Sequence, residues 1–310
     1  MKVIKNNDKK VIITPPPQSR VPIETPDNLF THHVNMVVVG KRGSGKSVFI
    51  SNYLRMLKEA GKLDRLIMIS ATAGSNYALL ESFGVDENDI LDPEDRDIPN
   101  KIIKLIDDER DDWVQYLNDL EEWKQYQKIL HDDRININNI DPYYLLKFSD
   151  EYGNPVKPES KYGHRPIIHC FLDDCQSTPI FRNRKFLNCI LRQRHMGQMP
   201  YKKNNKEFCG AIGLSFYTAV QNLKSTSSGI FKALRNNATQ CVIVGKTKDV
   251  SELDDLYESV GGEIDKEQFM KAYEYATTDK HGTLVIDLHP KKGMPYLRKN
   301  MNELLYFETE

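Results

Sequence analysis

The residues from Gly40 to Ser47 read GKRGSGKS and fit the pattern G-x-x-x-x-G-K-[ST]. They follow the apolar run VNMVVV at 34–39 and precede a stretch with helical spacing, which is the context that the pattern requires. Glycines let the backbone curl so that its N–H groups point inward and form a nest for anions at the beginning of a helix. The sequence therefore predicts a phosphate-binding loop.

Each part of this loop has an expected task, with ATP and Mg²⁺ as the expected ligands. Lys46 places a positive charge at the β- and γ-phosphates, and the hydroxyl of Ser47 is a ligand for Mg²⁺. We expect that a Cβ at Gly40 or Gly45 would obstruct the curl of the backbone. The residues predicted to hold the nucleotide are Gly40, Lys41, Arg42, Gly43, Ser44, Gly45, Lys46, Ser47 and Val48.

A second GKT, at 245–247, lacks the glycine that a phosphate loop needs five residues earlier, because that position is Gln240. We interpret it as an ordinary strand exit. The residues at 247–249, Thr-Lys-Asp, also fail the N-K-x-D pattern that reads guanine, which disfavours a GTPase.

The metal ion beside a phosphate loop needs an acidic residue at the carboxyl end of a buried strand, and the run PIIHCFLDD at 166–174 supplies two. Asp173 is the predicted metal-side carboxylate. Asp174 is the candidate general base, which must lie within hydrogen-bond or one-water reach of the attacking water. The alternative is that the pair caps the next helix.

Further polar candidates follow the later strands. Gln221 ends the run AIGLSFYTAV, and we expect it either to orient water and sense the γ-phosphate or simply to satisfy a loop. An arginine finger stabilises charge on the γ-phosphoryl group and can come from an adjacent subunit. The candidates are Arg182, Arg184, Arg192, Arg194 and Arg235.

Five short apolar runs position these residues, and they lie at 34–39, 65–70, 166–172, 211–220 and 240–244. Runs of this length between helical segments are typical of strands buried on both faces of a parallel sheet. The fold class predicted is α/β, a P-loop NTPase of the RecA-like type with strand order 5-1-4-3-2.

The rest of the chain is divided by composition. Residues 1–33 are rich in proline, which predicts an extended N-terminal arm. Residues 34–310 are predicted to form the ATPase domain. Within the domain, 100–165 is interpreted as a helical insertion whose residues Trp113, Tyr116, Leu120 and Trp123 share a face that packs on the body. The acidic run 107–112 is expected to be solvated. Residues 246–310 are expected to contain helices, one at 266–277, and a final strand or hairpin arm at 283–290.

Composition sets broad limits on the class of protein. The 310 residues include 28% charged residues and carry a net charge of −1, so contact with nucleic acid would need a local basic patch. No apolar run approaches the roughly 18 residues that suggest a membrane span, and the N-terminus lacks a secretory signal. Five cysteines on or beside apolar stretches indicate buried thiols in a reducing compartment.

Taken together, the motifs resemble the genome-packaging ATPases of large double-stranded DNA viruses and virophages, in the FtsK/HerA superfamily. The resemblance covers about Val34 to Gly245. It rests on GKRGSGKS at 40–47, MISATAGSN at 68–76, LDD at 172–174, Arg-His at 194–195 followed by Val-Gln-Asn at 220–222, and LRNN at 234–237.

The resemblance implies a motor that assembles as a homo-oligomeric ring of five or six subunits at a capsid vertex and pumps double-stranded DNA into a preformed shell. It implies a sensor role for Gln221, an arginine in trans at Arg194 or Arg235, and a location in the host cytoplasm or the virion. Two features depart from the family. The second acidic residue is Asp174 where glutamate is common, and the link from His195 to the fourth strand is longer.

That link is the candidate DNA contact, because Lys202, Lys203 and Lys206 form a basic patch beside Tyr201. A solvated lysine loop is the alternative. Three other functions share the same phosphate loop: another FtsK/HerA-like translocase for segregation, conjugation or resection, a small-molecule kinase, and a nucleotide-dependent scaffold.

Overall fold

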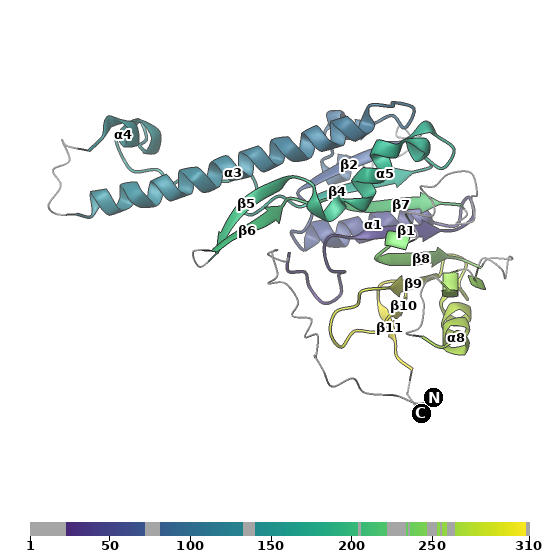
Figure 1. Cartoon of the computed structure of the whole chain (residues 1–310). Helices are drawn as coiled ribbons and strands as arrows, with labels where there is room; N and C mark the ends of the chain where they lie inside the picture. The colour runs from purple at the N-terminus through teal and green to yellow at the C-terminus, as the bar shows by residue number, and fades with distance from the viewer. Residues whose placement is uncertain are drawn as a thin grey trace, which may run out of the picture.

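The computed structural model describes residues 23–71, 81–132, 140–203, 206–221, 234, 236–246, 253–254, 256–258 and 264–307, without the side chains of 200–203 and 206–209. Its centre is a nine-stranded sheet in the order β11-β10-β9-β8-β1-β7-β4-β2-β3 (Figure 1). The strands of this sheet are β1 (Asn35–Val39), β2 (Arg65–Ser70), β3 (Ile90–Leu91), β4 (Ile168–Asp173), β7 (Ser215–Val220), β8 (Gln240–Val244), β9 (Thr283–Asp287), β10 (Leu297–Lys299) and β11 (Glu303–Leu305).

The parallel half of the sheet confirms the predicted fold class. The five apolar runs become β1, β2, β4, β7 and β8, and their order β8-β1-β7-β4-β2 is the 5-1-4-3-2 order. All their pairings are parallel, and β1, β4, β7 and β8 are buried at every position. The carboxyl ends of these strands therefore meet at one edge of the sheet, where the phosphate loop follows β1.

Two apolar layers cover the sheet, as a doubly wound fold requires. One layer contains α1 (Lys46–Glu59), whose buried residues include Ile50, Tyr53 and Leu57. The other contains the beginning of α3 (Ile98–Leu130), with α5 (Arg184–Leu191) and α8 (Lys266–Ala276). The helix predicted at 266–277 is confirmed by α8. The described cysteines, Cys170, Cys175, Cys189 and Cys241, are free and buried.

The fourth predicted strand, 211–220, is wrong at its beginning. Ala211 ends β6 (Lys206–Ala211), which pairs with β5 (Gln198–Lys203) in a separate antiparallel hairpin, and β7 starts only at Ser215. Between them Gly213 has φ +75°, and a Cβ there would collide with the ring of His33. This residue turns the chain, because a left-handed conformation suits glycine alone at so close an approach. The long link after His195 is therefore this hairpin.

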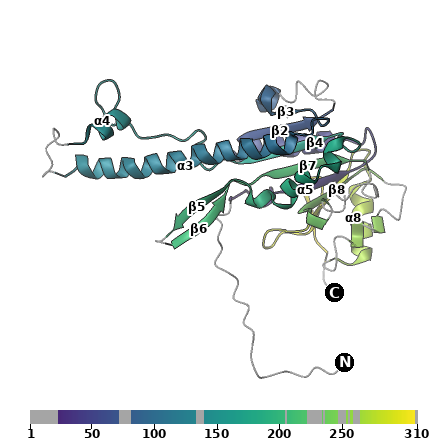
Figure 2. The same ribbon diagram turned by 45° about the horizontal axis from the view of Figure 1, so that its top comes forward.

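The stretch interpreted as a helical insertion contains two helices, but it does not lie on the body along its whole length. α3 has 33 residues, and with α4 (Pro142–Phe148) at its far end it projects well beyond the sheet (Figures 1 and 2). The hairpin β5–β6 extends in the same direction in both views. We call the projecting part of α3 together with α4 the arm.

The predicted aromatic face of α3 divides between two places. Trp113 packs against the core of the body, whereas Trp123 packs in the arm beside Tyr126 and Phe148. Helical periodicity identified the residues but could not show that the helix leaves the body between them. The acidic run also contains an exception to the expected solvation, because Glu109 is buried and forms ion pairs with Arg65 and Lys161.

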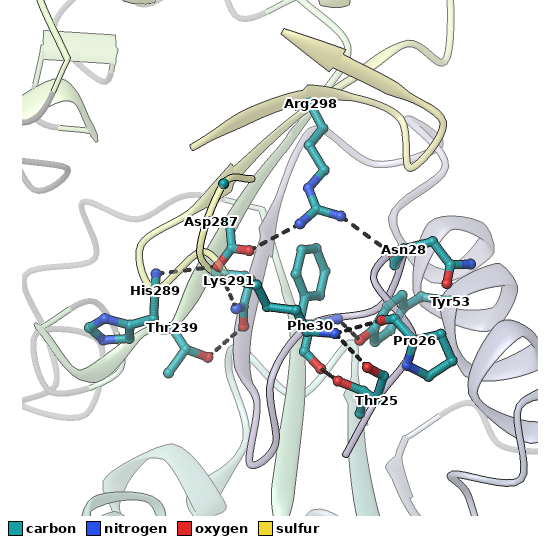
Figure 3. Close-up of polar contacts among 12 residues, drawn as sticks. Thr25, Pro26, Asn28, Phe30, Tyr53, Thr239, Asp287, His289, Lys291 and Arg298 are labelled. Carbon is teal, nitrogen blue, oxygen red and sulfur yellow. Dashed lines mark hydrogen bonds and ion pairs between the residues drawn. The ribbon is translucent and has the colours of Figure 1, made fainter. Parts of the chain in front are cut away.

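The C-terminal region adds more strands than the sequence indicated. β9 lies within the strand predicted at 283–290, but it pairs antiparallel with β8, and β10 and β11 continue the sheet as a meander. Arg298 of β10 and Asp287 of β9 form a buried ion pair, with Nη2 3.2 Å from Oδ2 and side chains only 1% and 2% exposed (Figure 3). Gln240 Nε2 donates to the other carboxylate oxygen at 2.9 Å.

This ion pair also holds the segment that precedes β1. The guanidinium of Arg298 lies over the ring of Phe30 at 4.9 Å from its centroid, and Lys291 donates to the carbonyls of Thr25 and Pro26 (Figure 3). Leu29 and Phe30 are buried in the same core as α1. The packed body therefore begins before Val34. The sequence had placed the end of the extended N-terminal segment at residue 33, and residues 1–22 of that segment lie outside the described residues.

None of the helices that the structure describes is long and apolar enough to cross a membrane.

Candidate nucleotide site

The phosphate loop is built by the backbone at the end of β1. Gly40 N donates to Val220 O at 3.2 Å, and Gly43 and Gly45 have φ +73° and +107° before α1 begins at Lys46. A Cβ on Gly40 would lie 2.5 Å from Ser44 Oγ and 2.8 Å from Val244 O, so the predicted obstruction is confirmed there. At Gly45 the reason is different, because the nearest atom would be 3.5 Å away and it is the positive φ that requires glycine.

A histidine from the C-terminal region supports the loop. His281, in the turn before β9, places Nδ1 2.8 Å from the carbonyl oxygen of Ser44. A carbonyl only accepts, so Nδ1–H is the donor. This contact fixes the peptide before Gly45 and joins the loop to the meander. Sequence reasoning missed His281, because no pattern around KHGT links it to a loop more than two hundred residues earlier.

Lys46 lies over the loop and is half-buried. Its Nζ donates to the carbonyl oxygens of Gly40 at 2.8 Å and of Lys41 at 3.0 Å. Burial lowers the pKa of Lys46 from its usual value, and the nearby carboxylates of Asp174 and Asp173 oppose this effect. A cation that is partly desolvated beside two carboxylates is well placed to receive the charge of a triphosphate.

The predicted metal pair is brought together although its members lie far apart in the sequence. Ser47 Oγ donates to Asp173 Oδ1 at 2.7 Å, and Asp173 is 7% exposed at the end of β4. Asp174 follows with φ +54° and is exposed. This left-handed conformation, uncommon for a residue with a side chain, turns Asp174 away from the line of the strand. The two carboxylates therefore leave the strand in different directions, Asp173 buried and Asp174 exposed.

Gln221 lies where the strand order places it, at the tip of β7 between β1 and β4. The backbone N–H of Gln221 donates to Oε1 of Gln176 at 2.7 Å. Val220 pairs with Val39, so Gln221 follows directly beside the beginning of the phosphate loop. Gln176 was not predicted. Its only sequence signal is its place three residues after Asp173.

One arginine candidate lies at the opposite edge of the sheet from the phosphate loop. Arg194 is exposed on the turn Gln193–His195, where Gln193 O accepts from Leu214 N just before β7 begins. β7 runs parallel to β1, so this turn lies at the amino ends of the strands, away from its own phosphate loop. Arg182, Arg184 and Arg192 are also exposed, near and on α5. Arg235 is outside the described residues.

The predicted DNA residues lie on the hairpin. Lys202 and Lys203 end β5, Lys206 begins β6, and Lys203 pairs with Lys206 near the turn. The hairpin projects in the same direction as the arm (Figure 1). The side chains of these lysines lie outside what the structure describes, so their contact with DNA stays a prediction.

The loop and its neighbours fit a magnesium nucleotide. Ser44 Oγ is buried and has no hydrogen-bond partner among the described residues, inside a loop whose N–H groups begin a helix. Mg²⁺ in nucleotide sites is bound by one or two carboxylates together with substrate phosphates, and Ser47 and Asp173 supply a hydroxyl and a carboxylate in contact. Such a site binds a polyphosphate and polarises its terminal phosphoryl group.

Comparisons with known proteins find likeness in solved structures alone. No family model and no curated protein matches the chain. It is similar to the genome packaging NTPase B204 from Sulfolobus turreted icosahedral virus 2 in complex with sulfate, at 14% identity and a TM-score of 0.41, over 82% of this chain and 90% of that one.

Two further ATPases are also similar in structure. EssC (ATPases 2 and 3) from Geobacillus thermodenitrificans has 14% identity and a TM-score of 0.37, over 76% of this chain and 36% of that one. The cytoplasmic domain of the type VII secretion ATPase EccC from Thermomonospora curvata has 13% identity and a TM-score of 0.37, over 87% and 25%.

Proposed function

We propose that this chain is an ATP-driven motor that packages viral double-stranded DNA into a preformed capsid. The observation that carries the ATPase part is the contact between Ser47 and Asp173, which unites the phosphate loop with the acidic end of β4. The packaging part rests on the combination of motifs that resembles the FtsK/HerA packaging ATPases.

The site residues divide the work of hydrolysis. Lys46 binds the terminal phosphates, and Ser47 with Asp173 holds Mg²⁺, which neutralises charge on the β- and γ-oxygens when it is bound. Asp174, exposed beside them, takes the proton of the attacking water. Gln221 orients that water or senses the γ-phosphate from the neighbouring strand tip.

The position of the arginines supports a shared site in a ring. Arg194 lies at the amino ends of the strands, so it would meet the nucleotide of an adjacent subunit rather than its own. A homo-oligomeric ring, a pentamer or hexamer, would also carry the hairpin lysines Lys202, Lys203 and Lys206 around a duplex. Capsid vertex proteins would be its further partners, and the host cytoplasm or the virion its location.

The first experiment measures ATP hydrolysis with and without double-stranded DNA. We expect DNA-stimulated turnover that is lost in Lys46→Ala and in Asp173→Ala and is kept in Lys104→Ala, an exposed lysine on α3. Turnover that requires a small hydroxyl acceptor and ignores DNA would favour a kinase, and nucleotide binding without turnover a scaffold. DNA movement without packaging of DNA into capsids would favour another FtsK/HerA-like translocase.

Subunit mixing tests the shared site. Lys46→Ala subunits mixed with Arg194→Ala subunits should regain part of the activity, because some interfaces then combine an intact loop with an intact arginine. Absence of rescue at every ratio would contradict a role for Arg194 in trans.

The hairpin is tested by its salt dependence. Replacing Lys202, Lys203 and Lys206 together with alanine should weaken DNA binding and flatten the slope of log affinity against log salt. The matched control replaces Lys104, Lys124 and Lys128 of α3. An unchanged slope in the hairpin variant would remove the hairpin from the DNA path.

A further inference from the structure

A cavity opens beside the phosphate loop and runs along α1. It has a volume of about 750 Å³, and its wall opposite α1 comes from the turns before β9 and after β10, including His281, Asn300 and Met301. On the helix side the lining residues include Val48, Phe49 and Tyr53. We call this cavity the α1 groove.

The size of the α1 groove suits a small organic ligand. Binding cavities for such ligands range from about 300 to 1,000 Å³. The lining of α1 extends from Lys46 to Met56, and at 1.5 Å per residue this is about 15 Å. The groove therefore has room for a ribose and a two-ring base beyond the phosphates.

The groove is lined by apolar side chains together with polar ones such as Asn52 and Asn302. Phe49 and Met301 are both partly buried against the core that contains α1. Tyr53 is fully buried, and its hydroxyl receives the backbone N–H of Phe30 at 3.2 Å, so its polar atom is already engaged (Figure 3). Val48, in contrast, is 63% exposed in the first turn of α1, a large apolar side chain at the mouth of the groove. An aromatic ring and a thioether are surfaces on which a planar base packs well.

Asn300 is a polar lining residue whose side chain is held by hydrogen bonds. It has φ +53°, its backbone N donates to Thr283 O at 2.9 Å, and its Oδ1 accepts from Thr283 N and Oγ1, both at 3.1 Å. These three bonds hold the side chain in one orientation and use its oxygen. The two N–H donors of Nδ2 have no acceptor among the described residues, so they are available to a ring nitrogen of a base.

We propose that the α1 groove binds the ribose and base of a purine nucleoside triphosphate, with Phe49 and Met301 on the faces of the base and Asn300 Nδ2 donating to its edge. The proposal rests on the proposed function, because the phosphates of the same ligand lie in the loop. It assigns Phe49, Asn300 and Met301 as specificity residues in addition to the loop residues 40–48.

The experiment compares two ligands by titration calorimetry on the full chain with Mg²⁺. ATP contacts both the loop and the groove, whereas inorganic tripolyphosphate contacts the loop alone. For the unchanged chain we expect ATP to bind at least tenfold more tightly than tripolyphosphate and at least fivefold more tightly than CTP. Equal affinity for ATP and tripolyphosphate would contradict binding of the ribose and base in the α1 groove. Equal affinity for ATP and CTP would contradict the preference for a purine.

Substitutions locate the effect. Met301→Glu should lower ATP affinity at least tenfold and change tripolyphosphate affinity less than threefold, whereas the control Leu304→Glu adds the same charge on β11, at a residue 37% exposed, and should change neither. Unchanged ATP affinity in Met301→Glu overturns the proposal. If that variant loses both ligands, Asn300→Asp decides, since it keeps the acceptor for Thr283 and removes the donor.

For Asn300→Asp we expect the ratio of ATP to tripolyphosphate affinity to fall at least fivefold, and an unchanged ratio overturns the proposal. The failure of the proposed function gives a different result. An unchanged chain that binds neither ATP nor tripolyphosphate contradicts the phosphate loop itself and takes this inference with it.

Discussion

The two buried aspartates at the ends of strands have opposite surroundings. Asp287 ends β9 at the edge of the sheet where β8 begins, and it bonds the guanidinium of Arg298 and the amide of Gln240. Asp173 ends β4 at the carboxyl edge. There it accepts a hydrogen bond from the neutral hydroxyl of Ser47, and its negative charge raises the pKa of Lys46 against the effect of burial. The carboxylate of Asp287 is neutralised by a buried partner and has a structural role. The carboxylate of Asp173 lies beside a loop of N–H groups, so it can bind a cation while the loop binds phosphates.

The largest expected effect is a loss of ATP hydrolysis when Asp173, at the carboxyl edge of the sheet, is replaced. Asp173→Asn keeps the shape of the side chain and removes its charge, so ATP hydrolysis should fall by at least about 100-fold, the usual size for loss of one electrostatic contact in a transition state. Steady-state hydrolysis measures this. The free energy of unfolding should change by less than about 1 kcal/mol, because asparagine keeps an oxygen that accepts the hydrogen bond from Ser47. Equal loss of stability and activity would remove the distinction between the two aspartates.

At the Arg298–Asp287 ion pair, a substitution should lower the free energy of unfolding. Arg298→Met leaves Asp287 buried without its cation, and breaking a buried pair on one side costs about 3 to 5 kcal/mol. Denaturant unfolding measures it. The control is Lys299→Met, the next residue of β10, whose partner Asp279 is largely exposed, and about 1 kcal/mol or less is expected there. Similar costs for the two variants would contradict a structural role for the buried pair.

A buried histidine in the parallel half sharpens the comparison through pH. His169 Nε2 lies 2.8 Å from Lys62 O and Nδ1 2.9 Å from the hydroxyl of Tyr217, and burial lowers the pKa of His169 to about 4. The unfolded chain binds a proton below pH 6.5 and the folded chain only near pH 4. Stability is therefore fully present above about pH 6.5 and falls as pH drops toward 4, by about 3 kcal/mol.

The measurement is the free energy of unfolding between pH 4 and 7 for the unchanged chain and for His169→Gln. Glutamine can replace both hydrogen bonds without titrating, so the variant should lose most of this slope. Burial and the neighbouring His169 both lower the pKa of His32, so His32 keeps part of the pH slope in the variant, and the difference between the two proteins includes this coupling. Identical slopes would show that His169 titrates normally.

The smallest effect on the body is expected from the arm. Phe148 is buried in a cluster with Tyr126 and Ile140 that is separate from both layers of the sheet. Phe148→Ala should speed amide hydrogen exchange around α4 while the unfolding free energy of the sheet changes by less than about 1 kcal/mol, because local and global opening are separate events. A loss of several kcal/mol in the sheet would show that the arm and body unfold together.

The sequence predicted the part of the fold in which hydrogen bonding and burial leave a simple pattern. Strands such as 65–70 and 240–244 are buried on both faces and read as continuous apolar runs, and the phosphate loop has a fixed spacing. From these two signals the strand order and the meeting of Ser47 with Asp173 followed. Both were predictable because the carboxyl ends of parallel strands share an edge.

The remaining features depend on contacts that spacing does not record. β10 and β11 have three residues each, LRK and ELL, too few for any periodicity, so the meander and with it Asn300 and His281 were missed. The direction of α3 depends on where its apolar face ends at the body. Gly213 interrupted an apolar run at a point where only the nearness of His33 explains the turn.

The length of α3 has a consequence for how assemblies of this chain are counted. Its 33 residues span about 50 Å, whereas a compact chain of 310 residues has a radius of gyration of about 19 Å. We expect a single subunit with such a projection to diffuse more slowly, and to elute earlier from a sizing column, than a compact chain of the same mass. Light scattering or sedimentation equilibrium, which report molar mass independently of friction, is therefore the way to distinguish one subunit from five or six.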